Sequence, residues 1–374
     1  MKEIRKIIEL YQQIDFSQRK VALATVVRVE GSSYRRPGAK MLITDDGRWV
    51  GAISGGCLEG DALRKARQVM LDGKPMMVTY DTMNDDANSL GVGLGCNGII
   101  DVFIEPIDPD YFQDHSLYFW KQCTTNRAAF IEIKVVKAPE SYTGIRHLIL
   151  TDSDADPGFI NFPEEEQLRQ AMNQTWQSGK SQLLTYVSDT IEVFIESIQP
   201  EIQLIIFGGG YDVPPLVEMA KVLGWHVTVT EDCIAHVAPK RFPGADAVLL
   251  VDRNNILSKL SFTERTAAVL MSHGYKYDKA ILEQLLISDV GYIGMLGPRK
   301  RYEKMLGEWE ESDKTFDDNR LTEVHSPIGL EIGAETPDEI ALAIVSEIQA
   351  HFHNKSGTPL RFKQGPIHER ILNG

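Results

Sequence analysis

The residues best suited to chemistry lie in the segment Ser54-Gly-Gly-Cys-Leu-Glu-Gly60, where a cysteine follows two glycines. The segment joins a predicted strand to a predicted helix, and we expect Cys57 in the first turn of that helix. The positive helix end and nearby N–H groups favour a thiolate there, the form that binds soft metals and attacks sulfur. The alternative is that Cys57 is a small buried hydrophobic residue. Glu59 is either a proton carrier beside the thiol or a carboxylate that stabilises the helix N-terminus.

Two further glycine-containing segments can line the same pocket. One is Gly91-Val-Gly-Leu-Gly-Cys-Asn-Gly98, and the other is Ser32-Ser-Tyr-Arg-Arg-Pro-Gly38, whose two guanidinium groups suit an anionic ligand. The candidate binding residues of this half are therefore Arg35, Arg36, Ser54, Gly55, Gly56, Cys57, Cys96 and Asn97. Cys123 and Cys233 lie outside such segments and are predicted to be structural.

A third glycine-rich segment, Gly208-Gly209-Gly210, follows an apolar strand predicted at 201–207 and precedes a predicted helix. In a dinucleotide-binding loop, glycines in this context let a pyrophosphate approach the helix N-terminus. Asp232 lies roughly 20 residues further on, where an acidic side chain holds a ribose hydroxyl. However, Val213 replaces the third glycine of the motif and two prolines follow it. A glycine turn is also needed merely to fold such a sheet, so nucleotide binding and a structural role both stay open.

The ends of other predicted strands in this half add His273 and Arg299 as candidates. Ligands of open α/β sheets bind at the carboxyl edges of the strands, where these residues are expected. The alternative for His273 is a satisfied structural histidine. Arg299 either neutralises a phosphate or belongs, with Lys300 and Arg301, to a solvated basic face.

Hydrophobic periodicity assigns the first group of candidates to a mixed α/β domain, residues 1–198. An amphipathic helix is predicted at 1–11 and a second helix at 58–71. Strands are predicted at 21–29, 40–44, 48–53, 75–80 and 99–105, with the second and third forming a hairpin around Asp45-Asp46-Gly47. Residues 111–198 show a weaker pattern and are assigned to this domain without detail.

The second group of candidates belongs to a predicted Rossmann-like domain, residues 199–352, followed by a tail, 353–374. Strands alternate with helix-length segments, which is the βαβ signature of a parallel, doubly wound sheet. The strands are predicted at 201–207, 225–230, 245–251, 266–271 and 290–295. A final helix is predicted to begin near Thr336-Pro337.

Composition excludes several classes of protein. The 374 residues carry a net charge of −14, which argues against broad binding to nucleic acid or to an anionic membrane. Four cysteines are too few and too scattered for a disulfide scaffold or an iron–sulfur protein. The first residues lack a signal-peptide pattern, and the longest apolar stretches, such as 21–27, fall far short of a membrane span. We therefore expect a cytoplasmic protein.

Blocks of sequence in both halves resemble the XdhC/CoxI family, accessory proteins for the maturation of xanthine dehydrogenase and related molybdenum hydroxylases. The blocks in the first half are 30–38, 51–61 and 94–98. Those in the second half are 207–210, 241–246, 276–278, 292–299 and 325–337. The family commonly has a Gly-Ala-Gly-His type of loop where this chain has Gly208-Gly-Gly-Tyr211.

The resemblance implies a protein that binds the molybdenum cofactor (molybdopterin), assists its sulfuration and inserts it into an apo-hydroxylase. It implies contact of Cys57 with molybdenum or sulfur, with Cys96 as a second candidate. The expected partners are apo xanthine dehydrogenase or a related hydroxylase, a cysteine desulfurase, and a second copy of the chain in a homodimer. The competing hypothesis is an oxidoreductase that uses NAD(P) or another nucleotide, and a third is that the second domain is only a dimerisation scaffold. The catalytic xanthine dehydrogenase is disfavoured because it needs iron–sulfur cysteines.

Overall fold

The structure is a computed structural model. It describes residues 2–31, 33–81, 98–108, 116–143, 147–151, 161–233 and 237–364. These residues form two compact units, the first reaching Pro200 and the second running from Glu201 to Lys363.

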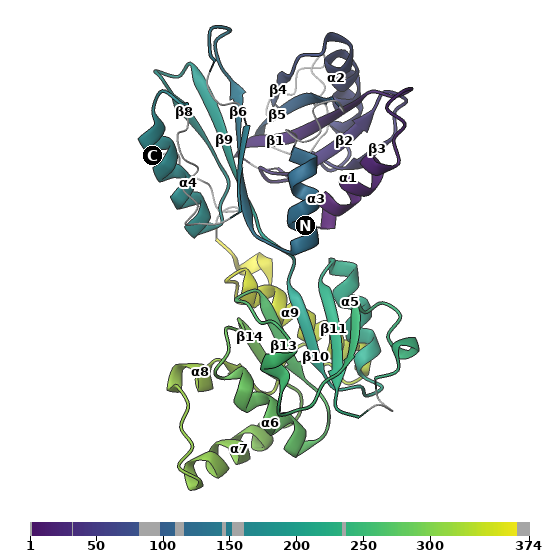
Figure 1. Ribbon diagram of the computed structural model, residues 1–374, viewed down its shortest axis with the longest axis vertical. Coiled ribbons are helices and arrows are strands. Elements are labelled where there is room, and N and C mark those ends of the chain that lie inside the picture. Colours follow the sequence, from purple (N-terminus) through teal and green to yellow (C-terminus); the bar gives the residue numbers. More distant parts are fainter. Residues whose placement is uncertain are drawn as a thin grey trace. The chain divides into compact units, whose positions relative to one another are not determined.

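The first unit begins with a five-stranded antiparallel sheet, called the first sheet below (Figure 1). Its strand order is β3-β2-β1-β5-β4. The strands are β1 (Val21–Gly31), β2 (Lys40–Thr44), β3 (Trp49–Gly51), β4 (Met76–Asp81) and β5 (Gly98–Ile107). β2 and β3 pair as the predicted hairpin, so this part of the sequence interpretation is confirmed.

Helices cover both faces of the first sheet. The alternation of side chains along β1 sends Ala22 and Ala24 towards α2 (Glu59–Asp72), whereas Val21 and Leu23 face the opposite way. On that opposite face the core is completed by α1 (Lys2–Gln12) and α3 (Ser116–Asn126). Because β1 has core on both sides, it reads in the sequence as a continuous apolar strand.

The part of the first unit that lacked a clear sequence pattern forms a second antiparallel sheet, with order β7-β6-β9-β8. Its strands are β6 (Phe130–Lys137), β7 (His147–Leu150), β8 (Gln182–Tyr186) and β9 (Ile191–Ile198). Odd-numbered residues such as Ile131 and Ile195 pack against α4 (Glu165–Ser178). On the other face, Val136 and Phe194 join Phe103 of β5, so the two sheets share a core.

Charged side chains are buried where these two sheets meet. The ammonium group of Lys40 on β2 donates to both carboxylate oxygens of Glu196 on β9, and also to the carbonyl oxygen of Gly38 at 3.0 Å. Lys134 on β6 pairs with Glu105 on β5. Lys40 and Glu196 are only 2% and 8% exposed at their side chains, so their charges are satisfied by each other rather than by water.

The second unit contains a six-stranded, entirely parallel sheet of order β12-β11-β10-β13-β14-β15. The strands are β10 (Gln203–Phe207), β11 (His226–Glu231), β12 (Ala247–Leu250), β13 (Thr266–Leu270), β14 (Tyr292–Met295) and β15 (Val324–His325). The order reverses between β10 and β13, as in a dinucleotide-binding fold. β15 is too short to give a periodic signal and was not predicted from the sequence.

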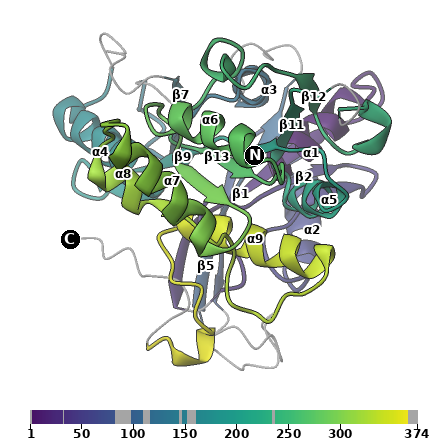
Figure 2. The ribbon, with the colours of Figure 1, turned by 90° about the horizontal axis from the view of Figure 1, so that it is seen from below.

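Helices lie on both faces of this sheet, so the doubly wound fold class is confirmed (Figure 2). One face packs on α5 (Val213–Leu223) and α9 (Pro337–Phe352), and the other on α6 (Tyr275–Leu285) and α7 (Arg299–Glu311). α9 starts at the predicted position, where Thr336 and Glu339 form a capping box. Shorter helices are α8 (Asp318–Thr322), η2 (Pro239–Arg241), η3 (Ile256–Ser258) and η4 (Leu360–Phe362), the last within the predicted tail.

Two connections differ from the expected alternation of strands and helices. Between β12 and β13 the chain contains only the 3₁₀ turn η3, and the second such connection is the one from β11 to β12. Between β11 and β12 the described residues contain only the 3₁₀ turn η2, where a helix-length segment had been predicted. Proline at the start of this turn and the Pro-Gly pair that follows Phe242 interrupt any longer helix.

Replacing Lys40 by methionine tests the buried contact between the two sheets. The Lys40→Met substitution leaves the Glu196 carboxylate buried without its partner, so we expect the free energy of unfolding of the first unit to fall by about 3–5 kcal/mol. Hydrogen exchange at β2 and β9 measures this loss. The double variant Lys40→Met/Glu196→Leu removes both charges and should recover most of the stability.

The matched control is Lys137→Met, which removes a lysine that pairs with Glu192 at 2.7 Å on the surface. Solvent screens that pair, so we expect no resolvable change in exchange at β2 and β9. Equal effects of the two lysine substitutions would show that the buried pair does not hold the sheets together.

Candidate functional site

The loop that carries Cys57 is closed by hydrogen bonds between Ser54 and Glu59. The Ser54 hydroxyl donates to one carboxylate oxygen of Glu59 at 2.5 Å, and the Ser54 backbone N–H donates to the other at 2.8 Å. The same hydroxyl oxygen accepts the backbone N–H groups of Gly56, Cys57 and Leu58 at 3.1–3.2 Å. One buried serine and one buried glutamate thus fix the backbone on both sides of the cysteine.

These contacts favour the second of the two roles considered for Glu59, the stabilisation of the helix N-terminus. Burial alone would raise its pKa, but the hydrogen bonds from the side chain and backbone of Ser54 outweigh burial and lower it. A carboxylate held in this way is ionised and has both oxygens in use. Glu59 therefore supports the loop and the start of α2. Ser54, which was predicted to contact a ligand, supports the same loop through its hydrogen bonds.

Cys57 itself is exposed, which excludes the interpretation that it is a small core residue. Helix α2 begins at Glu59, so the prediction that Cys57 lies in the first helical turn is wrong by two residues. The neighbouring Gly56 adopts φ +111°, a left-handed conformation that a side chain would strain, and among the described residues a Cβ there would meet nothing within 4 Å. The backbone next to the exposed Cys57 therefore requires a glycine.

Tyr34, which the sequence interpretation did not select, lies beside this loop. A Cβ on Gly55 would lie 3.5 Å from the Tyr34 ring, and the tyrosine is 72% exposed. An exposed aromatic ring beside the loop that carries the exposed thiol offers a flat surface on which a heterocycle can stack. Its only sequence signal was its place between Ser33 and Arg35 in the glycine-containing segment.

The two arginines of that segment differ. The guanidinium group of Arg35 pairs with Glu3 of α1, and its role in holding an anionic ligand stays a prediction. Arg36 is exposed. The remaining candidates of this half, Cys96 and Asn97, lie outside the described residues, as does most of the glycine segment that contains them.

In the second unit the predicted site residues lie at the carboxyl ends of four strands. Gly208 follows β10, Asp232 follows β11, His273 follows β13 and Arg299 begins α7 beyond β14. A Cβ on Gly208 would lie 2.6 Å from the carbonyl oxygen of Met271, so this glycine is required for the sheet itself. Gly209 is buried and Arg299 is exposed.

The dinucleotide site predicted here does not fit the residues present. Asp232, expected to hold a ribose hydroxyl, pairs with Arg253. The helix that should receive the pyrophosphate starts with Val213, whose N–H contacts the carbonyl oxygen of Gly210 at 3.5 Å, followed by two prolines without N–H groups. A buried carboxylate, Asp212, stands immediately before it. The loop thus offers negative charge where a phosphate needs donors.

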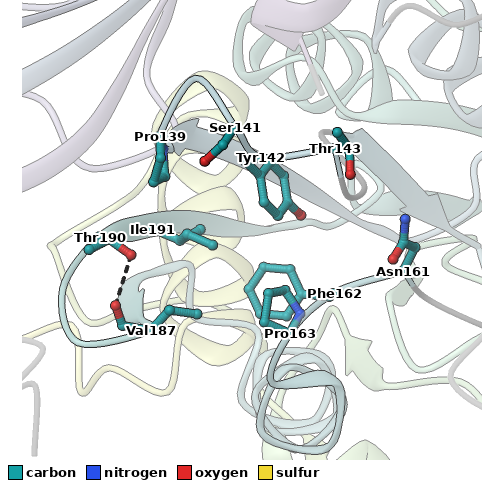
Figure 3. A pocket seen from close by; sticks show the side chains of 10 residues that line it. All are labelled: Pro139, Ser141, Tyr142, Thr143, Asn161, Phe162, Pro163, Val187, Thr190 and Ile191. Atoms are coloured by element: carbon teal, nitrogen blue, oxygen red, sulfur yellow. Dashed lines mark hydrogen bonds between the residues drawn. The ribbon is translucent and has the colours of Figure 1, made fainter.

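A hollow of about 370 Å³ lies elsewhere in the first unit, beside the β8–β9 turn (Figure 3). In that turn the hydroxyl of Thr190 donates to the carbonyl oxygen of Val187 at 2.8 Å. The hollow is lined by Pro139, Ser141, Tyr142, Thr143, Asn161, Phe162, Pro163, Val187, Thr190 and Ile191, none of which was predicted to be a site residue.

The described part of the chain lacks two further kinds of feature. No group of three or more histidine, cysteine, aspartate or glutamate side chains there could hold a metal ion. No helix in that part is long and apolar enough to cross a membrane.

Comparison with known proteins identifies the class. A sequence model described as the XdhC and CoxI family matches residues 17–81, and one described as the XdhC Rossmann domain matches residues 204–348. A Bacillus subtilis protein, named as a probable subunit of xanthine dehydrogenase, is 34% identical over 332 residues, which cover 88% of this chain and 93% of the relative. The molybdenum cofactor insertion chaperone PaoD of Escherichia coli is 21% identical over 344 residues, covering 92% of this chain and 87% of PaoD.

The chain belongs to the XdhC and CoxI family. Its fold agrees with this assignment, since it is similar to the crystal structure of a xanthine dehydrogenase from Bacillus halodurans. That comparison has a TM-score of 0.74 and 30% identity, and it covers 95% of this chain and 99% of the other. The matched stretches contain Cys57 with its loop in the first unit and His273 in the second.

The hydrogen bonds of Glu59 should make the Cys57 loop sensitive to acid. Because the pKa of Glu59 is lowered in the fold, its contribution to stability is present above the ordinary value of 4.5 and is lost as the pH falls through the lowered value. We expect the amides of Gly56 and Cys57 to exchange faster in this acidic range, after correction for intrinsic rates. In Glu59→Gln that additional acid dependence should disappear, and the same dependence in both proteins would contradict the role of Glu59.

Proposed function

We propose that this protein binds the molybdenum cofactor and acts as an accessory factor for xanthine dehydrogenase or a related molybdenum hydroxylase. The observation that carries the proposal is the exposed thiol of Cys57 on a loop fixed by Ser54 and Glu59. Two relatives support it by name: one is called a subunit of xanthine dehydrogenase and the other a molybdenum cofactor insertion chaperone. The cofactor is cargo, held until the hydroxylase accepts it.

The chemistry of the loop suits this cargo. A thiolate is a soft ligand for molybdenum or for a sulfur atom bound to it. Among the described residues, a Cβ at Gly56 or Gly60 would meet nothing within 4 Å, which leaves room for a bulky group. The exposed ring of Tyr34 can stack on the flat pterin. The rigid hydrogen bonds below the loop keep the thiol pointing to one place while the cargo arrives and leaves.

The proposal extends to sulfuration, insertion and partners. Bound at Cys57, the cofactor would be protected while a cysteine desulfurase supplies its sulfido ligand, and would then pass to the apo-hydroxylase. The protein needs no turnover of its own for this role. We further propose that it works in the cytoplasm as a homodimer. The alternative, an NAD(P)-dependent oxidoreductase, is less well supported because Asp212, Pro214 and Pro215 occupy the dinucleotide loop.

The two exposed cysteines of the described chain provide a matched test. Protein purified without oxygen is mixed with molybdenum cofactor, separated from excess, and assayed for molybdenum and pterin. We expect Cys57→Ser to lower retention by about tenfold or more, because it removes a direct ligand. Cys233→Ser changes another exposed thiol, in the other unit, and should leave retention unchanged.

Equal retention by wild type and Cys57→Ser would contradict cofactor binding at this loop. Activation of an apo-hydroxylase by the same three proteins then tests delivery separately from binding. Hydride transfer from NAD(P)H to a candidate substrate would instead support the oxidoreductase.

A further inference from the structure

An aspartate and a histidine meet at the place where the strand order of the second unit reverses. Asp212 follows β10 and His273 follows β13, and these two strands are neighbours in the sheet. From β10 the chain continues to β11 and β12 on one side, and from β13 to β14 and β15 on the other. The crevice outside the strand ends at such a reversal is where open α/β sheets bind ligands.

The two side chains are in direct contact and differ in exposure. His273 Nε2 lies 3.0 Å from Asp212 Oδ2. The aspartate side chain is 7% exposed, whereas the histidine side chain is 58% exposed. The carboxylate is therefore buried behind an imidazole whose other edge faces solvent.

Helix capping does not explain Asp212. It precedes α5, yet its side chain makes no capping hydrogen bond. Pro214 and Pro215 in the first turn have no N–H groups that would need a cap. The Asp212 side chain therefore does not act as a hydrogen-bonding cap for α5.

The second carboxylate oxygen of Asp212, Oδ1, gives further evidence that this residue is not explained by helix capping. Oδ1 is buried and has no hydrogen-bond partner among the described residues. Gly210 lies against it, since a Cβ at that glycine would be 2.4 Å from Oδ1 and 3.4 Å from His273 Nε2. A buried carboxylate with an unsatisfied oxygen costs free energy, so its retention requires a use. The group that it contacts is His273.

His273 is itself held in an unusual conformation. Its φ is +61°, in the left-handed region that residues other than glycine rarely adopt. The adjacent Ser272 fixes this turn, accepting the N–H of Gly274 at 3.0 Å and donating to Asp278 at 2.5 Å. Asp278 is anchored in turn by Arg301. The strained turn therefore presents the imidazole at one fixed place over Asp212.

We propose that His273 is a proton-accepting residue for a ligand bound at this edge and that Asp212 is its positioning residue. Asp212 accepts the Nε2–H and so leaves Nδ1 unprotonated and exposed. A ligand hydroxyl or thiol gives its proton to Nδ1, the ligand keeps the electron pair as an anion, and ionised Asp212 stabilises the imidazolium formed. The ligand is neutral or cationic before the transfer, because the buried carboxylate and the two prolines disfavour a phosphate.

This site is separate from the cofactor proposal, because it does not involve Cys57 or its loop. Histidine labelled with ¹⁵N reports the protonation of each ring nitrogen, and the His273→Gln variant identifies the His273 signals. We expect unprotonated Nδ1 and protonated Nε2 in the neutral ring of wild-type His273. A protonated Nδ1 in the neutral ring of wild-type His273 would overturn the proposal, and this measurement needs no Asp212 variant.

The second measurement is the rate at which diethyl pyrocarbonate modifies each histidine, followed by peptide mass spectrometry. Asp212→Asn places an amide donor beside Nε2 and favours the tautomer that carries its proton on Nδ1. The exposed Nδ1 is then no longer free to react, so we expect the reagent to modify His273 about tenfold more slowly. His353, whose Nδ1 lies 2.8 Å from the carbonyl oxygen of Gln349, is exposed and serves as the internal control. Equal rates at His273 in both proteins, with His353 unchanged, would contradict the positioning role.

Anionic probes test the class of ligand. We expect NADH and inorganic phosphate to leave the His273 signals of the wild-type protein unchanged. A saturable shift with either probe at micromolar concentration would overturn the proposal and assign an anion site. None of these outcomes depends on molybdenum retention, so this inference and the proposed function fail independently.

Discussion

The buried pair of Lys40 and Glu196 is the constraint on which the first unit depends. It joins a strand of the first sheet to a strand of the second, and its ammonium group also holds the carbonyl oxygen of Gly38. Gly38 ends the segment that carries Tyr34, and Tyr34 lies against Gly55 in the Cys57 loop. The position of the candidate site is thus linked to an ion pair that is almost completely buried. Burial, together with the neighbouring Glu132 carboxylate, raises the pKa of Glu196 in spite of the nearby Lys40.

The other buried charges near that pair also have partners of opposite charge. Burial would raise the pKa of Glu132, yet the neighbouring Lys134 and His147 hold it well below its usual range. Glu132 also accepts the indole N–H of Trp120 at 2.9 Å, and the Trp120 ring lies within 6 Å of both lysines. An apolar interior of the same shape would be at least as stable. We infer that the network fixes one register of the two sheets, and therefore one position of the glycine loops.

This network also explains what the sequence could and could not predict. Continuous apolar runs such as β1 and β10 were found because both of their faces are core. In β6 the alternation of Ile with Glu132 and Lys134 is typical of a half-exposed strand, and this signal was missed. It would also have placed the two charged residues in solvent, whereas they are 1% and 4% exposed. The exposed thiol of Cys57 could be anticipated from its glycines. Asp212 could not, because its role depends on His273, a residue 61 positions away.

The two units present two kinds of chemistry, a soft thiol on a rigid loop and a histidine oriented by a buried carboxylate. The central claim is that the thiolate of Cys57 binds the molybdenum atom of the cargo directly. X-ray absorption at the molybdenum edge, recorded on the complex prepared without oxygen, tests it most directly. The account predicts one more sulfur neighbour of molybdenum in the wild-type complex than in molybdenum cofactor bound to the Cys57→Ser variant or free in solution. The same number of sulfur neighbours in all three samples would contradict it.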